Sequence, residues 1–299
     1  MGVTYTSGPW LRRVVVTLGP LGQWKGRASG SAVRFEGDGT MNGLRLSCEL
    51  HKVLMGTPQA SSITVYNLSQ DTRNAIRSGL TRVKVEAGWQ NMGMHIVFKG
   101  NVFSVLSERS GPDIVTKISA APGYGPLATS VSTRQFEGGW PVRTAVRMLA
   151  GDLGQDIMID DADIQGVEGR LAEGGWYHSG STKEGLDRLA SEYGFSWNID
   201  FDQFKAIGDK AVLGRTTELN GNGGALIGVT PVLSGPMQAM TGVKLKAVYV
   251  PDVRPGNTVR VNSVISPNCN GTYKVASCDI SMDTHADAWT MDIDAKTIQ

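Results

Sequence analysis

Strand-like alternation is the feature of this 299-residue chain that most restricts its fold. In the segment TRVKVEAGW, the residues Val83, Val85, Ala87 and Trp89 occupy every second position. Side chains on a β-strand point to opposite faces in turn, so this spacing places the apolar side chains on one face. Such a strand is expected in a sheet that has one buried face and one face in contact with water.

Similar runs fill the first part of the chain and are separated by turn signals, EGDG at 36–39 and SGPD at 110–113. The clearest runs are RRVVVTLG, LRLSCEL, SSITVYNL, HIVFKGNVFSVLSE and DIVTKISA. Their β-branched and aromatic residues favour strands. The sequence therefore predicts a first β domain over residues 1–126, with no helix in the Gly-rich stretch 123–128 that leads out of it.

A short helix is expected inside this β region. The stretch SSITVYNLSQDTRNAIRSG reads as a strand, a polar corner and a helix from Asp71 to Ser78. We expect Ala75 and Ile76 to face inward and Arg73 and Arg77 to face outward.

Two segments between residues 127 and 213 have helical spacing. In WPVRTAVRMLAGDLG, Pro141 suits a first turn, and apolar residues recur at intervals of three and four. In STKEGLDRLASEYG, Ser181 and Glu184 have capping-box spacing, and Gly194 suits the helix end. FSWNIDF then alternates like a strand, and Asp202-Gln203 turns the chain into FKAIGD. The sequence predicts a small inserted α+β module over 127–213.

Strands return over residues 214–299, and their layout resembles that of the first region. FKGNVFSVLSERSGPDIVTKISA and NGTYKVASCDISMDTHADAWTMDIDA each read as a glycine, a strand, a polar turn and a second strand. The match is one of pattern rather than identity. It predicts a second β domain over 214–299 that is similar to the first.

Composition excludes several classes of protein. The net charge is +1, which lacks the strongly basic footprint of a dedicated nucleic-acid binder. No run of about 18 apolar residues indicates a membrane span, so we expect no membrane association. Cys48, Cys269 and Cys278 cannot all pair within one chain. We expect them to be small core residues, with a local Cys269–Cys278 bridge as the alternative.

The most suggestive acidic segment lies at residues 156–168. Asp161, Asp163, Gln165 and Gly166 imitate the start of a calcium loop, but Ala172 stands where the bidentate Glu should be. We expect a solvated acidic loop, and the sequence leaves open whether it binds an ion. No zinc spacing, nucleophile elbow or phosphate loop is present. The sequence therefore predicts no cofactor, no metal and no catalytic residue.

The order of the structural motifs resembles that of the baseplate hub proteins of tailed bacteriophages. SITVYNLSQDTRNAIRSG, VKVEAGW and IVFKGNVFSVLSERSGPDIVTKISA are similar to the first domain of that family, and VPDVRPGNTVRVNSV and NGTYKVASCDISMDTHADAWTMDIDA are similar to its closing strands. The family is tail-tube-like and includes phage late-control protein D and the hub part of type VI secretion spikes. The resemblance covers the chain from about residue 10 to its end.

This resemblance implies a mainly β fold, with two tail-tube-like β-barrel domains flanking the α+β module. It also implies a structural virion protein that is not an enzyme. Three copies would form a ring in the tail baseplate, assembled in the host cytoplasm, that adapts the hexameric tail tube to the central spike or tail-tip protein. Other baseplate proteins are expected partners, with the tape measure protein as a further candidate. DNA would pass through the lumen without specific binding.

Two alternatives stay open from the sequence. The first is a tail-associated enzyme that degrades cell wall, for which pairs such as Asp160–Asp161 or Asp200–Asp202 would supply the carboxylates. The second is a receptor-binding or carbohydrate-binding β module. In that case Trp140, Trp176, Tyr177 and Trp197 would stack on sugars.

Overall fold

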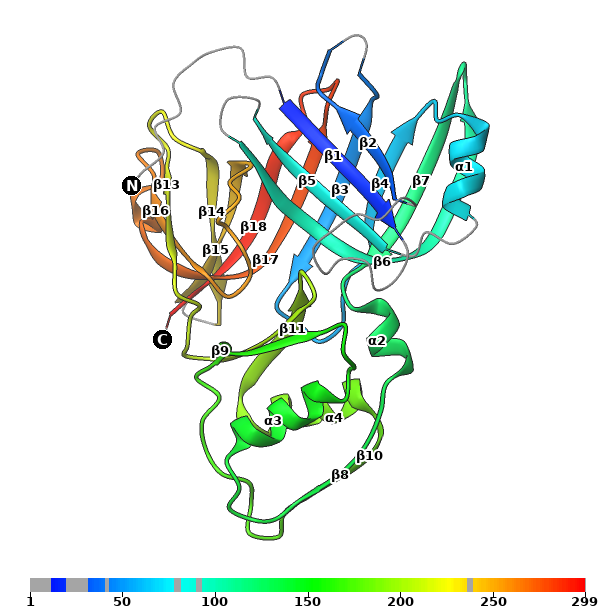
Figure 1. The fold of residues 1–299 in the computed structure, drawn as a ribbon. Helices are drawn as coiled ribbons and strands as arrows, with labels where there is room; N and C mark the ends of the chain where they lie inside the picture. Colours follow the sequence, from blue (N-terminus) through cyan, green and yellow to red (C-terminus); the bar gives the residue numbers. More distant parts are fainter. Residues whose placement is uncertain are drawn as a thin grey trace.

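The fold is mainly β with an inserted α+β module, as the sequence predicts (Figure 1). The computed structural model describes residues 12–19, 32–40, 43–77, 82–89, 93–235 and 239–298. In this described part, no helix is long and apolar enough to cross a membrane.

The elements fall into three groups along the chain. The first β unit consists of β1 (Arg12–Gly19), β2 (Val33–Gly37), β3 (Leu46–Val53), β4 (Ser61–Tyr66), α1 (Gln70–Arg77), β5 (Arg82–Trp89), β6 (Gly93–Ser110) and β7 (Asp113–Ala121). The module consists of α2 (Tyr124–Thr129), β8 (Val131–Phe136), α3 (Val142–Gly151), β9 (Met158–Gln165), β10 (Trp176–Ser181), α4 (Thr182–Tyr193), β11 (Phe195–Asp200) and β12 (Gln203–Gly208). The second β unit consists of β13 (Thr216–Asn220), β14 (Leu226–Ser234), β15 (Ala239–Val248), β16 (Thr258–Asn262), the 3-10 turn η1 (Pro267–Cys269), β17 (Gly271–Asp283) and β18 (Trp289–Thr297). The domain boundaries expected at 126 and 213 stay a prediction.

A single 13-stranded sheet runs through both β units. Its order is β14-β15-β18-β17-β3-β4-β7-β6-β5-β1-β2, with β16 and β13 branching from β17. The units meet where β3 pairs antiparallel with β17 over seven residues, from Ser277 opposite Val53 to Asp283 opposite Ser47. The two β units therefore share one sheet.

The pairing of strands fixes one buried side of this sheet. Cys48, Ile63 and Ile118 lie directly opposite one another on β3, β4 and β7, and each is at most 1% exposed. Residues of the second unit, such as Ile280 and Met291, belong to the same hydrophobic cluster. All three cysteines are free and buried, which confirms their expected role as core residues.

The internal similarity between the two β regions extends to an irregularity in their pairing. Each region contains a long hairpin, β6–β7 in the first unit and β17–β18 in the second. In both hairpins the first strand carries a register shift, between Val102 and Ser104 and between Val275 and Ser277. Such a bulge bends a strand and increases its twist. The shared bulge supports the duplication that the sequence pattern indicated.

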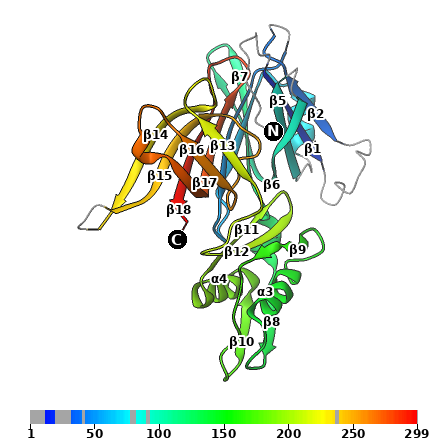
Figure 2. The same ribbon diagram turned by 90° about the vertical axis from the view of Figure 1, so that its left-hand side faces the viewer.

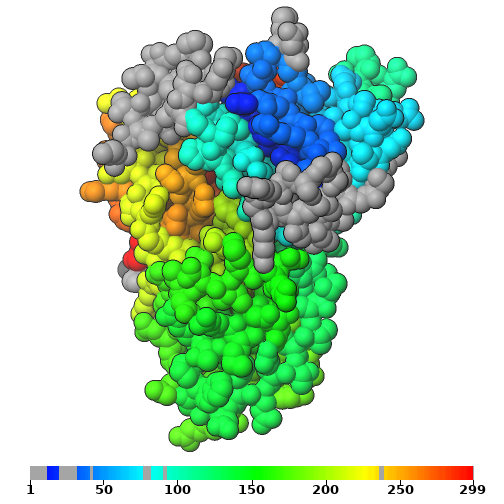
Figure 3. Space-filling view, viewed as in Figure 1, coloured from blue at the N-terminus to red at the C-terminus, as the bar shows by residue number. Residues whose placement is uncertain are grey.

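The module has its own core and lies beneath both β units (Figures 2 and 3). Helices α3 and α4 pack on each other, on the β8–β10 ribbon and on the sheet β11-β12-β9. Leu149, Leu186, Phe204 and Trp197 are at most 1% exposed within it. Because this cluster is separate from that of the β units, the contacts between module and β units form a distinct interface.

Several local expectations need correction. Residues 124–129 form the short helix α2 instead of a plain linker, since Gly123 takes a left-handed conformation and Pro126 is tolerated in a first turn. The acidic segment contains a strand, β9, because its backbone pairs in parallel with the free edge of β12. Ser181 begins α4 without making the expected capping hydrogen bond.

Helix α1 begins and ends within one residue of its expected bounds. Ile76 is buried as predicted, but Ala75 is exposed, because only one residue of that turn points at the sheet. Arg73 is half-buried, where the sequence pattern placed it outward. The side chain of Arg77 lies outside the described residues.

Two glycines in the module allow a matched test of local conformation. Gly194 ends α4 with φ at +66°, whereas Gly151 is the last residue of α3 and has open space around its Cα. We expect Gly194→Ala to lower the free energy of unfolding by about 1 kcal/mol, because alanine disfavours the left-handed region. Gly151→Ala should leave it unchanged or raise it by up to about 1 kcal/mol. Urea denaturation measures both free energies of unfolding. Equal effects of the two substitutions would contradict the left-handed conformation assigned to Gly194.

Candidate functional site

One face of the 13-stranded sheet is polar across both β units. Directly opposed residues on paired strands point to the same side, so the register identifies each row. One row crosses six strands and consists of Thr290, Ser281, Glu49, Ser62, Ser119 and Ser104. The next row consists of Lys246, Asp292, Asp279 and His51. All of these side chains are half-buried or exposed, and together they are called the polar sheet face.

Several charged side chains of the polar sheet face have close polar partners. His51 Nδ1 lies 2.8 Å from Asp279 Oδ1, and the Ser62 hydroxyl donates to Glu49 at 3.4 Å. One row further, Lys244 lies 4.0 Å from Asp294. The face therefore presents hydroxyls and charges of both signs, and its carboxylates Glu49, Asp279 and Asp292 outnumber its lysine, Lys246.

The β11–β12 hairpin joins the module to both β units (Figure 1). Its two-residue turn consists of Phe201 at φ +54° and Asp202 at φ +67°. A tight hairpin turn of this kind requires positive φ at both central residues, and aspartate tolerates it far better than phenylalanine does. Phe201 is only 9% exposed. Its unusual backbone conformation must therefore be stabilised by what its side chain contacts.

Two cations from different β units contact the ring of Phe201. Lys52 Nζ, from β3, lies 4.2 Å from the ring centroid. The guanidinium carbon of Arg254, from the loop between β15 and β16, lies 4.6 Å from the same centroid. A desolvated cation over an aromatic ring contributes about 2 kcal/mol. One aromatic side chain of the module thus joins the first and second β units.

Buried charges surround this ring. Asp200 lies 3.7 Å from Lys52 and 3.3 Å from Lys205, and all three side chains are at least nine-tenths buried. Burial opposes the ionisation of Asp200, but Lys52, Lys205 and Arg254 outweigh it and lower the pKa of Asp200 below its ordinary value of 3.8. Burial also lowers the pKa of Lys52. Charges this deeply buried are tolerated only when they are paired.

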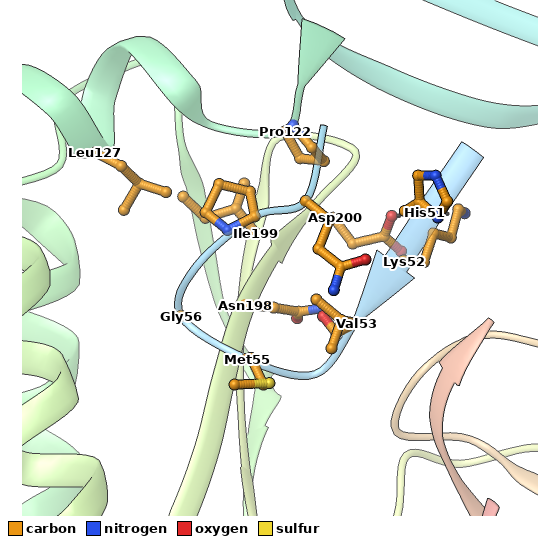
Figure 4. Close-up of a pocket in the computed structure, with 12 residues that line it drawn as sticks. His51, Lys52, Val53, Met55, Gly56, Pro122, Leu127, Asn198, Ile199 and Asp200 are labelled. Atoms are coloured by element: carbon orange, nitrogen blue, oxygen red, sulfur yellow. Dashed lines mark hydrogen bonds and ion pairs between the residues drawn. The ribbon is translucent and has the colours of Figure 1, made fainter. Parts of the chain in front are cut away.

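Further polar contacts complete the interface between the module and the β units. This interface is called the ionic junction. Arg82 on β5 pairs with Asp202, with side chains 6% and 11% exposed. Asn198 Nδ2 donates to the Val53 carbonyl at 2.9 Å, and Lys274 Nζ donates to the Gly208 carbonyl at 2.9 Å. Figure 4 shows Asn198 and Asp200 of β11 facing Lys52 and Val53 of β3 around a small pocket.

Sequence reasoning missed the ionic junction. It placed the hairpin turn at Asp202-Gln203, one residue late, because the alternation of FSWNIDF suggested that Phe201 continued the strand. The partners Lys52, Arg82 and Arg254 lie far from the hairpin in sequence. The one available signal was FDQF, where an aspartate in a turn stands between two buried aromatic residues.

The acidic segment 156–168 is paired with arginines instead of forming an isolated loop. Arg147 lies 3.1 Å from Asp161, and Arg143 donates to the Asp161 carbonyl at 2.6 Å. Among the described residues, no group of three or more acidic, histidine or cysteine side chains has the geometry of a metal site. Asp200 and Asp202, considered for the enzyme alternative, are both held in ion pairs inside the ionic junction.

The four aromatic residues considered as sugar platforms are split by the fold. Trp176 is 5% and Trp197 1% exposed, and both pack in the core of the module. Trp140 and Tyr177 are exposed at 37% and 58%. Two of the four are therefore unable to stack on a ligand, which removes the aromatic cluster on which the carbohydrate-binding alternative relied. Residues 90–92, between β5 and β6, lie outside the described residues.

The buried pair Arg82–Asp202 gives a test of the ionic junction. We expect Arg82→Met to lower the free energy of unfolding by about 3–5 kcal/mol, because Asp202 is then left buried without a partner. The double variant Arg82→Met/Asp202→Asn should recover part of this loss, since asparagine keeps the left-handed turn without the charge. Urea denaturation at neutral pH measures the free energy of unfolding of each variant.

The exposed pair Arg147–Asp161 is the matched control, with side chains 56% and 55% exposed. Arg147→Met should change stability by at most about 1 kcal/mol. A loss in Arg82→Met as small as that of the control would contradict a structural role for the buried pair.

The lowered pKa of Asp200 predicts a specific acid response. Because the folded state favours the ionised carboxylate, the stability it contributes is fully present above its unfolded pKa of about 4 and is lost as pH falls toward its folded pKa. We expect a smaller acid loss in Asp200→Asn than in the wild type between about pH 5 and pH 2. Denaturation across this range measures it, with the exposed Asp252→Asn as control. Parallel profiles for wild type and Asp200→Asn would contradict the expectation.

Solved structures of tail and secretion proteins share this fold. A tail protein from Neisseria meningitidis matches with a TM-score of 0.62 at 12% identity, over 96% of each chain. A 43 kDa tail protein of a Shewanella oneidensis prophage matches with a TM-score of 0.61 at 10% identity, over 95% of this chain and 96% of that one. A component of the E. coli type VI secretion system matches with a TM-score of 0.61 at 13% identity, over 87% of this chain and 76% of that one.

Sequence comparison identifies the family. A search of curated protein sequences finds no match. The family model described as baseplate hub gp41 matches residues 32–295, which include the whole module, the first β unit from β2 onward and nearly all of the second β unit. The match covers far more than half of the chain and agrees with the fold of the solved tail proteins. The chain therefore belongs to the baseplate hub gp41 family and is a structural protein of the phage tail.

Proposed function

We propose that three copies of this chain form a ring at the hub of the tail baseplate. In this proposal each copy contributes two tube-like domains, residues 1–126 and 214–299, and the module 127–213 lies at one end of the ring. The ring joins the hexameric tail tube to the central spike or tail-tip protein and contacts other baseplate proteins and the tape measure protein. It is assembled in the host cytoplasm and is part of the virion.

The observation that carries this proposal is the polar sheet face. Its rows cross from the second β unit to the first without interruption, because β17 and β3 pair directly. A face with exposed hydroxyls and paired charges is suited to line a water-filled channel. DNA carries a strong negative charge and binds tightly to surfaces of opposite sign. A face on which carboxylates outnumber lysines would let DNA pass without holding it, which supports a role as part of the ejection channel.

Duplication of the β unit supports a ring that joins a sixfold tube to a threefold spike. Three chains with two similar units each present six similar units around an axis, which can meet a sixfold tube on one side and a threefold spike on the other. Closed rings of identical subunits are the common form of soluble assemblies. The relation of one solved neighbour to type VI secretion is consistent with contact to a spike.

The mass and shape of the purified chain test the ring. One chain has a mass of 32.0 kDa, so three copies should scatter light as a particle of about 96 kDa. Electron-microscopy class averages should show a central hole. A monomer with turnover on peptidoglycan would contradict the proposal and favour the enzyme alternative.

The position of the polar sheet face in the ring can be tested with a gold label. All three native cysteines are buried, so a Ser62→Cys variant offers one reactive thiol on the face. A maleimide gold particle on it should appear inside the central hole in class averages. The control Gln135→Cys, on the exposed face of β8, should place gold away from the axis. Gold from Ser62→Cys on the outer rim would contradict a lumen lined by this face.

A further inference from the structure

Among the described residues, two of the edges of the 13-stranded sheet lie at the ends of the polar sheet face; β2 and β13 form its other edges. Within the described residues, β14 pairs only with β15. The long strand β6 pairs with β5 through residues 93–101 and with β7 through residues 101–110. Beyond Asn101, therefore, one side of β6 has no strand partner in the described part of the chain. Unpaired edges are a liability that proteins protect or pair.

The directions of these two edges are fixed by the sheet. From β14 to β6 the order is β14-β15-β18-β17-β3-β4-β7-β6, and every neighbouring pair is antiparallel. An odd number of antiparallel steps separates the two edges, so β14 and β6 run in opposite directions. In a ring whose copies all point the same way, β14 of one copy would meet β6 of the next as an antiparallel pair.

Both edges carry exposed apolar side chains. Leu233, near the end of β14, is 50% exposed. Phe103 and Leu106, on the unpaired half of β6, are 42% and 58% exposed. Tyr124 of α2 extends this second patch, since its ring lies 5.0 Å from that of Phe103. Antiparallel pairing brings the end of β14 to the start of the unpaired half of β6, which places Leu233 beside Phe103.

We propose that neighbouring copies join head to tail, with β14 of one chain packed along residues 102–110 of β6 in the next. This inference rests on the proposed ring and names its contact. The occupant of each edge is a second copy because the two edges differ from each other, run in the opposite directions that antiparallel pairing requires, and bound the same polar face. Joining them closes that face around the axis, and two different surfaces in contact are what a closed cyclic ring requires.

Side chains contribute more to this contact than a continuous backbone ladder. Pro231 lies in the middle of β14 and cannot donate a hydrogen bond, and the strand has two register shifts. Proline and bulges are devices that limit unwanted strand pairing at an edge. Because backbone pairing is limited in this way, β14 is expected to bind only an edge whose apolar side chains lie opposite its own.

Cross-linking of separate variants tests the contact in the full chain. Leu233→Cys and Phe103→Cys chains with different tags are co-expressed and treated with a short bismaleimide. The buried native cysteines stay unreactive. We expect dimers that contain both tags, no cross-link in either variant expressed alone, and covalent trimers from the double variant. Tyr177→Cys, 58% exposed on β10 of the module, replaces Leu233→Cys in the control mixture and should give no cross-link.

Charge variants give an independent readout. Leu233→Asp should raise the concentration at which trimers form at least tenfold, and adding Phe103→Lys should restore much of the affinity. Tyr177→Asp is the control with similar exposure and should leave assembly unchanged. Thermal unfolding of each variant verifies that it is folded.

The outcomes separate this contact from the ring itself. A wild-type trimer in which the mixed variants fail to cross-link, or in which each variant cross-links to itself, overturns the head-to-tail contact and leaves the ring standing. A wild-type mass of one chain at every concentration overturns the proposed ring and, with it, this contact.

Discussion

The placement of the module depends on one aromatic ring that two cations contact. Phe201 adopts a backbone conformation that phenylalanine rarely takes, and Lys52 and Arg254 contact its ring from the two β units. The same lysine pairs with Asp200, so the strained turn and the buried charges stabilise each other. Because the module and the β units have separate hydrophobic cores, this ionic junction, and not a shared core, orients one against the other.

The pairing of β3 with β17 is the second constraint, because it turns two similar units into one sheet. Without this pairing, the faces of the two units would be independent surfaces. With β3 and β17 paired, Glu49 and Ser281 lie opposite each other, and the polar rows continue across the boundary between the units. The chain thus offers a long face of uniform chemistry that neither unit could present alone.

Local features were predictable from sequence because they depend on neighbouring residues. Alternation of polar and apolar residues located β5, periodic apolar residues located α3 and α4, and Gly194 located the end of α4. The repeated strand-turn-strand layout correctly indicated the two long hairpins. Long-range features were not predictable in this way. Nothing near Lys52 or Arg254 in the sequence indicates that both contact the same ring, and the β3–β17 pairing joins residues more than 200 positions apart.

Burial also explains why the chemical candidates in the sequence lead to structure rather than catalysis. Asp200 and Asp202 could be taken for a pair of catalytic carboxylates, yet each has a cation as its nearest charged neighbour, and both pair with the first β unit, through Lys52 and Arg82. Trp197 donates its indole N–H to Asp187 inside the module core. In each case the polar group is already satisfied within the chain. Strand edges and exposed apolar side chains are instead where a protein that acts by assembly is expected to meet its partners.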